Sequence, residues 1–292
     1  MNNRANAGFL SGRTAILIII LLLLAATIYI VASKKHQSQQ TSSPNVNAQT
    51  TTTTSLANLE LPAIKSNQDI VAHTGFALSY NEEHKEANWV AYKLTASQAN
   101  SSQFNRTNHF MEDPEVAEGT ANDEDYQGSG YDRGHLAPAE DMAWSAKSMQ
   151  ESFYYSNMTP QAPTFNRGVW RRLEELIRFW ANYYDSIFIV TGPVLTNDLP
   201  TIGRVSVPKY FYKVVLEYNA KEVRAIGFVM PNNASYATLK SFAVSVDSVE
   251  KLTGLDFFPK LPDDVENSVE SDPAINKWQW TRKKQKSEQS FK

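Results

Sequence analysis

The stretch Tyr131-Asp132-Arg133-Gly134-His135-Leu136-Ala137-Pro138 decides how the rest of this 292-residue sequence is interpreted. His135 stands there among polar neighbours, and an imidazole changes its charge near neutral pH. Arg133 offers a planar fork of donors that suits a phosphate, and Gly134 allows a backbone to come close to a ligand. An ordinary loop with a solvated histidine can carry the same four residues, so other parts of the chain have to decide.

A second polar stretch follows downstream as Asn157-Met158-Thr159-Pro160-Gln161, and then as Asn166-Arg167-Gly168-Val169-Trp170 with Glu174 beyond it. Asn166 stands where a helix is predicted to begin, so its side chain could simply cap that helix. On a regular helix the spacing from Asn166 to Glu174 corresponds to about 80° of rotation and ~12 Å of rise. Both side chains can then face one cleft, but they are too far apart to bind one ion directly. We expect one of them to ligate an ion and the other to act through water.

Taken together, these stretches resemble the DNA/RNA non-specific endonucleases of the ββα-metal superfamily. Several spaced motifs occur in the family's order over residues 70–260, and such a set is far more specific than any one motif. The matching stretches are residues 131–138, 156–161, 166–170 and 173–174, with residues 106–110 resembling the family's arginine motif and residues 190–193 at a similar strand end.

The resemblance implies a metal-dependent hydrolytic site that contains His135, Asn166 and Glu174. His135 matches the family's general base. Asn166 matches the sole direct protein ligand of Mg²⁺, for which Mn²⁺ can substitute, and Glu174 matches the acid that holds metal-bound water. The implied activity is hydrolysis of phosphodiester bonds in DNA and RNA, single- or double-stranded, with 5′-phosphate products.

Three further positions match supporting roles in that family. Arg106 matches the arginine that contacts the scissile phosphate, while Arg133 and Asn157 match supporting positions in the active site. His109 stands beside the arginine motif without a matching role, and we expect an ordinary polar loop residue there. The resemblance also implies a ββα-metal motif around the site.

These residue types suit the in-line hydrolysis of a phosphodiester. The reaction needs a deprotonated water on one side of phosphorus, stabilised charge on the equatorial oxygens and help for the departing 3′ oxygen. A neutral imidazole at His135 can accept the proton of water near neutral pH, provided that its other nitrogen is fixed by a hydrogen bond. A single amide ligand at Asn166 leaves the charge of the ion almost intact for the phosphate, which favours Mg²⁺ over a histidine-bound zinc.

Composition excludes several other kinds of site. The chain has no cysteine, which excludes a disulfide framework, a thiolate nucleophile and a cysteine-bound zinc. The formal net charge is -3, so a polyanion must be held by a local patch, for which Arg106 and Arg133 are suited. Contacts to phosphate carry no direct sequence information, and we see no base-reading element, so we expect weak sequence specificity.

Hydrophobic periodicity predicts an α+β fold with a mixed or antiparallel central sheet flanked by helices. Apolar or alternating runs bounded by turn residues predict strands at residues 76–80, 89–94, 186–191, 210–216 and 225–229. Apolar residues at steps of three and four predict a helix at residues 168–184. Further helices are expected within residues 236–252, ended by Gly254, and at residues 145–153.

The N-terminal part of the chain is predicted to form a membrane anchor and a spacer. After a short flank at residues 1–13, the twenty uncharged residues 14–33 are long enough to cross the hydrocarbon core of a bilayer as a transmembrane helix. Residues 34–69 are polar and poor in apolar groups, so we expect a disordered tether. It leads to the endonuclease domain at residues 70–280, and residues 281–292 form a basic tail.

The N-terminus has a rival interpretation as a cleaved signal peptide. Arg4 and Arg13 form a basic flank, and Val31-Ala32-Ser33 resembles a cleavage site, which would make the protein secreted. The longer apolar stretch favours an uncleaved anchor, although the flanking charges barely decide its orientation. We expect the domain to face away from the cytosol, since a nonspecific nuclease inside the cytosol would degrade the cell's own nucleic acid.

Two other functions fit the same sequence. One is a noncatalytic surface receptor for nucleic acid with this fold, and the other is a phosphodiesterase for small nucleotides. The intact set of His135, Asn166 and Glu174 favours an endonuclease. No feature predicts an oligomeric state, and the histidines expected in the spacer or in loops are His36, His73 and His84.

Overall fold

The computed structural model describes residues 58–65, 69–219 and 222–281. The chain divides into two compact units, Met1–Thr53 and Thr54–Lys292, and all described residues belong to the second unit. The predicted anchor at residues 14–33, most of the predicted spacer and nearly all of the basic tail lie outside the described residues. The prediction of a disordered spacer at residues 34–69 is wrong for residues 58–65, because Leu59 is buried in the core and the amide of Ala63 donates to the carbonyl of Asp256 at 2.8 Å. Within the described ranges, no helix has the length and apolar character that a membrane crossing requires.

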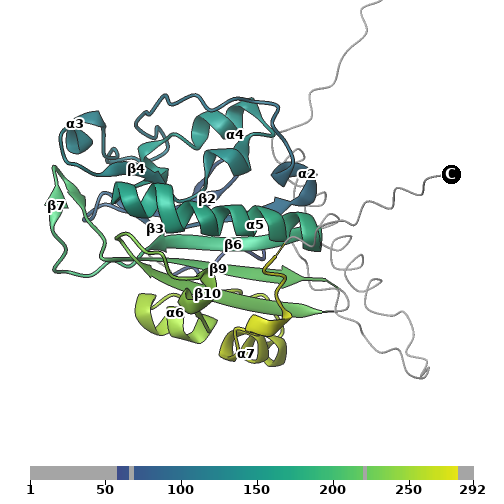
Figure 1. Ribbon diagram of the computed structural model, residues 1–292. Helices are drawn as coiled ribbons and strands as arrows, with labels where there is room; N and C mark the ends of the chain where they lie inside the picture. Colours follow the sequence, from purple (N-terminus) through teal and green to yellow (C-terminus); the bar gives the residue numbers. More distant parts are fainter. Residues whose placement is uncertain (1–57, 66–68, 220–221, 282–292) are drawn as a thin grey trace, which may run out of the picture. The chain divides into compact units, whose positions relative to one another are not determined.

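A seven-stranded antiparallel sheet forms the centre of the second unit (Figure 1). Its strand order is β1-β2-β3-β6-β9-β10-β11, and every neighbouring pair is antiparallel. All five strands predicted from the sequence overlap strands of this sheet, which confirms the α+β class. The strands are β1 (Val71–Ala72), β2 (Ala77–Asn81), β3 (Glu86–Thr95), β6 (Ser186–Pro193), β9 (Tyr210–Tyr218), β10 (Val223–Pro231) and β11 (Ala243–Val244).

Side chains of the sheet alternate between two apolar layers, as the two-residue period of a strand requires. On β9, Phe211 and Val215 face one layer, whereas Tyr212, Val214 and Leu216 face the other. Helix α5 (Arg171–Tyr184) covers the first layer. Helices α6 (Val246–Thr253) and α7 (Asp263–Ser271) pack on the second, on the opposite side of the sheet (Figure 1).

Helix α5 buries an apolar stripe that includes Leu173, Ile177 and Trp180. It follows a π-helical turn, η3 (Phe165–Trp170), in which Gly168 leaves helical geometry with φ -108° and ψ -109°. The helix predicted at residues 168–184 is therefore confirmed from Arg171 onward, while its start is a kinked turn.

The other two helix predictions are also confirmed. Helix α4 (Ala146–Glu151), capped by Ser145, is the short helix expected at residues 145–153. Helix α6 begins at Val246 and is the helix expected within residues 236–252, with Gly254 at its C-cap. The backbone of β11 pairs with β10 just before it, and Ser245 then caps α6 by accepting a hydrogen bond from the backbone of Ser248.

Smaller elements connect these layers and carry much of the candidate site. The periodicity of the sequence does not predict the β4–β5 pair, because each strand has only four residues. These elements are α2 (Ala96–Ala99), α3 (Asp123–Tyr126), the antiparallel pairs β4 (Asp132–His135) with β5 (Met158–Gln161) and β7 (Thr201–Ile202) with β8 (Val205–Ser206), and the 3-10 turns η1 (Ala139–Met142), η2 (Tyr155–Asn157), η4 (Leu239–Phe242) and η5 (Ile275–Lys277).

Candidate active site

The β4–β5 ribbon brings two of the sequence motifs together. In its register, Asp132 lies opposite Gln161 and His135 lies opposite Met158. Gly134 has a steric reason to be glycine, because a Cβ at this position would collide with the buried side chain of Gln161. Residues 131–138 and 156–161 therefore form one local structure.

His135 is buried in an aromatic setting. Its side chain packs edge to face against Phe153, with ring centroids 4.9 Å apart, and against Phe110 at 6.1 Å. Burial lowers the pKa of His135 to about 3, with the positive charge of Arg106 acting in the same direction, so its imidazole is neutral at pH 7. Its Nε2 has no hydrogen-bond partner among the described residues. Nε2 therefore does not make, within the described residues, the hydrogen bond that we expected to fix the imidazole. Packing against the two aromatic rings holds it.

Arg106 shares the ring of Phe153 with His135. The guanidinium carbon of Arg106 lies 5.0 Å from the centroid of that ring. The side chain stays 42% exposed, with Nε donating to Oδ1 of Asn108 at 2.7 Å and Nη1 lying 3.8 Å from Oε1 of Glu140. The arginine motif and the histidine motif, separate in the sequence, therefore meet at one aromatic side chain.

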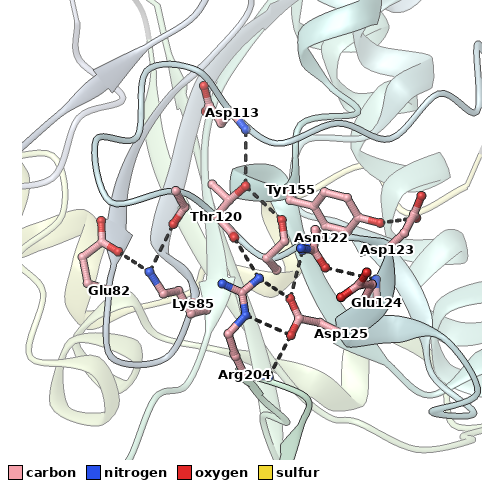
Figure 2. Close-up of polar contacts among 12 residues, drawn as sticks. Glu82, Lys85, Asp113, Thr120, Asn122, Asp123, Glu124, Asp125, Tyr155 and Arg204 are labelled. Carbon is pink, nitrogen blue, oxygen red and sulfur yellow. Dashed lines mark hydrogen bonds and ion pairs between the residues drawn. The ribbon is translucent and has the colours of Figure 1, made fainter.

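Arg133 is oriented by an ion pair and by an aromatic ring. Its Nη2 lies 2.7 Å from Oδ1 of Asp123, and its guanidinium carbon lies 4.8 Å from the centroid of Phe110. Figure 2 shows that the hydroxyl of Tyr155 donates to the same carboxylate, at 2.5 Å. Phe110, one of the two rings beside His135, thus also contacts the second arginine.

Helix α3, which carries Asp123, is tied to the β7–β8 hairpin. Arg204, in the turn of that hairpin, donates from Nη2 to Oδ2 of Asp125 at 2.8 Å and from Nε to Oδ1 at 3.2 Å (Figure 2). The side chain of Asn122 caps α3 by accepting a hydrogen bond from the backbone of Glu124. These contacts hold the partner of Arg133 in place.

Asn157 is completely buried and its side chain bonds only to the backbone. Its Oδ1 accepts from the amide of Ala137, while Nδ2 donates to the carbonyl of Ala137 and to that of Ser152. The distances are 2.9, 2.9 and 2.8 Å. Because Ala137 lies just beyond β4, this amide fixes the strand that carries His135 and does not itself reach solvent.

Asn166 lies inside the kinked turn η3, whose N-cap position is occupied by Thr164 and not by Asn166. Nδ2 of Asn166 instead donates to Oδ2 of Asp132 at 2.9 Å, and the same carboxylate pairs with Arg167. Since a carboxylate can only accept, the amide nitrogen must point at Asp132 and the amide oxygen away from it. The kink at Gly168 also breaks the regular helix on which the estimated offset from Asn166 to Glu174 depends.

Glu174 is half-buried on α5 beside two cations. Burial raises the pKa of Glu174, while the positive charges of Lys213 and Arg178 act to lower it. Lys213 belongs to β9 and is fully buried, with Nζ donating to the carbonyl of Leu136 at 3.3 Å and lying 4.8 Å from the ring centroid of Trp170. Burial in turn lowers the pKa of Lys213.

Three residues of the candidate site have no role predicted from the sequence, namely Lys213, Arg178 and Asp132. Lys213 could have been noticed in the sequence, because a lysine inside an apolar strand, on the same side as Phe211 and Val215, is unusual. Asp141 anchors Arg178 with a hydrogen bond of 2.9 Å from Nη1 to Oδ1. The acid on α5 is thus embedded in a network of buried charges.

The remaining histidines differ in their surroundings. His109 is exposed, as expected of a polar loop residue. His73 lies in the loop after β1, yet its side chain is only 2% exposed, with Nε2 2.8 Å from Oδ2 of Asp113. Nδ1 of His84 lies 2.8 Å from Oγ of Ser206. His73 and His84 are therefore structural members of the fold.

Comparison with known proteins gives a consistent result. The profile of the DNA/RNA non-specific endonuclease family matches residues 57–264. A nuclease of Syncephalastrum racemosum is 36% identical over 66% of this chain and 68% of its own length, and nuclease C1 of Cunninghamella echinulata var. echinulata is 35% identical over 66% and 84%. Human mitochondrial endonuclease G is 32% identical over 70% of this chain and 74% of its own. In a crystal structure of the EndoG/EndoGI complex, one chain superimposes with a TM-score of 0.64 at 30% identity, covering 70% of this chain and 90% of that one.

Proposed function

The chain belongs to the DNA/RNA non-specific endonuclease family, and from this premise we propose that it is a membrane-anchored, Mg²⁺-dependent enzyme in which His135 is the general base. The observation that carries the proposal is the common contact of His135 and Arg106 with Phe153. It places a neutral imidazole, which can accept a proton, and an exposed guanidinium, which can hold a phosphate, against one ring.

In this proposal the proton acceptor is the imidazole of His135. A base with a pKa of about 3 is always unprotonated near neutral pH but accepts protons weakly. The negative charge of a bound phosphate favours the imidazolium and therefore raises the pKa of His135 when substrate arrives. Arg106 holds that phosphate, Arg133 adds positive charge beside it, and Asn157 keeps the backbone after β4 in place.

The residues around Asn166 fit a divalent cation. The amide of Asn166 is turned by Asp132 so that its oxygen, a hard neutral ligand, is directed away from the carboxylate. We assign Mg²⁺ to this oxygen, with Mn²⁺ able to substitute, and a water-holding role to Glu174. Such an ion, when bound, neutralises charge on a nonbridging phosphate oxygen and on the departing oxygen. The β4–β5 ribbon followed by η3 and α5 would then be the ββα-metal motif of this chain.

Weak base specificity follows from the kinds of residues involved. Arg106 and Arg133 suit phosphate oxygens, which are the same at every nucleotide. We therefore propose DNA and RNA, single- or double-stranded, as substrates.

The proposed enzyme reaches its substrate from a membrane. Residues 14–33 would form the anchor, and the tether would end before residue 58. The nuclease domain, placed outside the cytosol, then includes residues 58–65, because Leu59 belongs to its core. A reporter fused after Lys292 that works only outside the cytosol is expected to be active. Activity of a cytosolic reporter at the same place would contradict this orientation, and recovery of a soluble protein that lacks residues 1–33 would favour signal cleavage.

The catalytic proposal is tested with the purified full-length chain in detergent, using plasmid DNA and long RNA with and without Mg²⁺. The substitution His135→Ala is expected to lower the rate roughly a hundred- to ten-thousand-fold, because it removes the general base. His109→Ala, at an exposed histidine, is the matched control and should retain activity. Absence of Mg²⁺-dependent cutting by the unmodified protein would favour a nucleic-acid receptor, and faster hydrolysis of dinucleotides than of polymers would favour a small-nucleotide phosphodiesterase.

A further inference from the structure

Three carboxylates converge where α6 meets α7. These two helices lie on the side of the sheet that faces away from α5 (Figure 1). They belong to Asp247, Glu250 and Glu270, and one carboxylate oxygen of each lies within 4.8 Å of those of the other two. Asp247 and Glu250 come from α6, whereas Glu270 comes from the last turn of α7. The cluster therefore lies where these two helices meet and is separated from His135 and Asn166 by the sheet.

Glu270 makes this cluster different from an ordinary acidic surface. The residue is only 6% exposed, and its Oε1 is buried without a hydrogen-bond partner among the described residues. A buried carboxylate oxygen that bonds to nothing is costly, because it has lost its water and gained no replacement. The side chain of Glu270 contributes a ligand atom to the group of three carboxylates. A partner for its Oε1 is therefore expected within this group.

The charges around Glu270 increase this cost. Burial raises the pKa of Glu270 to about 9, and Glu250, Glu266, Asp247 and Asp256 act in the same direction. All four of these neighbours are carboxylates, so each of them disfavours the ionised form. Two partners can resolve the conflict, namely a proton on Glu270 or a cation shared by the three side chains.

We propose that Asp247, Glu250 and Glu270 form a binding site for Ca²⁺ that ties α6 to α7. Three carboxylates provide hard oxygen ligands and no nitrogen or sulfur, which suits Ca²⁺ and disfavours zinc. Three oxygens spread evenly around a Ca²⁺ ion at its usual ligand distances lie about 4.0 to 4.5 Å apart, so oxygens that are already within 4.8 Å of one another need little rearrangement. Mg²⁺ demands shorter distances in a nearly regular octahedron and fits less well.

The local structure supports this occupant in two further ways. Oε1 of Glu250 accepts a hydrogen bond of 2.9 Å from the backbone of Phe257, which orients this carboxylate before any ion arrives. Asp247 is exposed, so the site is open to water on one side and solvent can complete the six to eight ligands that Ca²⁺ takes.

The test uses the purified full-length chain with Asn166→Ala, so that the candidate catalytic ion contributes nothing, and CaCl₂ as the probe. Calorimetric titration is expected to show one Ca²⁺ bound per chain, with a rise in the thermal unfolding midpoint that an equal concentration of Mg²⁺ does not produce.

Two variants locate the ion. Glu270→Gln should weaken Ca²⁺ binding at least about tenfold without lowering the unfolding midpoint in the absence of Ca²⁺, since it also removes repulsion. Asp247→Asn, at an exposed position where folding is not at risk, should weaken binding as well, whereas Asp264→Asn on another face of α7 should not. No Ca²⁺ binding up to pH 9, or binding that Asp247→Asn leaves unchanged, would overturn the proposal and leave a protonated Glu270.

Discussion

The carboxylate of Asp132 accepts a hydrogen bond of 2.9 Å from Nδ2 of Asn166, so a residue of the β4–β5 ribbon sets the orientation of the amide in η3. The bond links two motifs that are separate in the sequence. It also makes the position of the amide oxygen of Asn166 dependent on a side chain that need not touch an ion itself.

Removing this carboxylate should weaken the response to Mg²⁺. Asp132→Ala is expected to raise the Mg²⁺ concentration for half-maximal cutting about 10- to 100-fold, as loss of a residue that orients a metal ligand commonly does. Asp132→Asn keeps an acceptor oxygen and should have a smaller effect. If both variants titrate with Mg²⁺ like the unmodified protein, Asp132 does not orient the ligand.

The buried imidazole of His135 should make the protein less stable in mild acid. The unfolded chain, with a histidine pKa of 6.5, takes up a proton that the folded chain, with a pKa of about 3, does not. The contribution of this group to stability is therefore present above pH 6.5 and is lost as the pH falls. Between pH 7 and pH 5 the loss is about 2 kcal/mol. Urea unfolding of the unmodified protein and of His135→Asn should differ by this amount in their pH dependence, and parallel curves would contradict it.

Asn157 should be important for stability because all of its side-chain bonds are buried. Asn157→Ala leaves the amide and carbonyl of Ala137 and the carbonyl of Ser152 without these partners. We expect the free energy of unfolding to fall by about 3 kcal/mol, measured by urea titration. Asn105→Ala, at an exposed position, is the control and should change it little. A stable Asn157→Ala protein without activity would instead indicate a direct catalytic role.

Lys213 should control the charge of Glu174. Lys213→Met keeps an unbranched side chain in the apolar layer and removes the positive charge that lowers the pKa of Glu174. That pKa then rises, so activity that needs the carboxylate is lost at a higher pH as the solution is acidified. The acidic limb of the profile of rate against pH should move toward alkaline pH, while Lys209→Met, at an exposed lysine, should leave it in place. If the acidic limb stays in place in Lys213→Met, Lys213 does not control the pKa of Glu174.

Much of the sheet could be predicted from the sequence, because strands such as β6 and β9 are long apolar runs with clear ends. The order of the strands could not, since it depends on pairings between distant segments. The sequence places α6 only within residues 236–252, because Ala243 and Val244 continue an apolar pattern but their backbone pairs with β10, and periodicity does not reveal such competition.

The candidate site divides along similar lines. His135, Asn166 and Glu174 were found because their motifs follow one another in a recognisable order. The contacts that shape the chemistry of these residues could not be predicted, because Phe153 and Lys213 reach the candidate site from other elements. The burial that lowers the pKa of His135 is likewise a property of the assembled fold.

The collision that a side chain at position 134 would have with Gln161 makes these two positions interdependent. Gly134→Ala alone must push a buried glutamine out of its place, whereas the same change together with Gln161→Ala removes the obstacle. The pair should therefore compensate each other in a double-mutant cycle. Relatives that carry a side chain at the first position should carry a shorter residue at the second, so the two sites would evolve together.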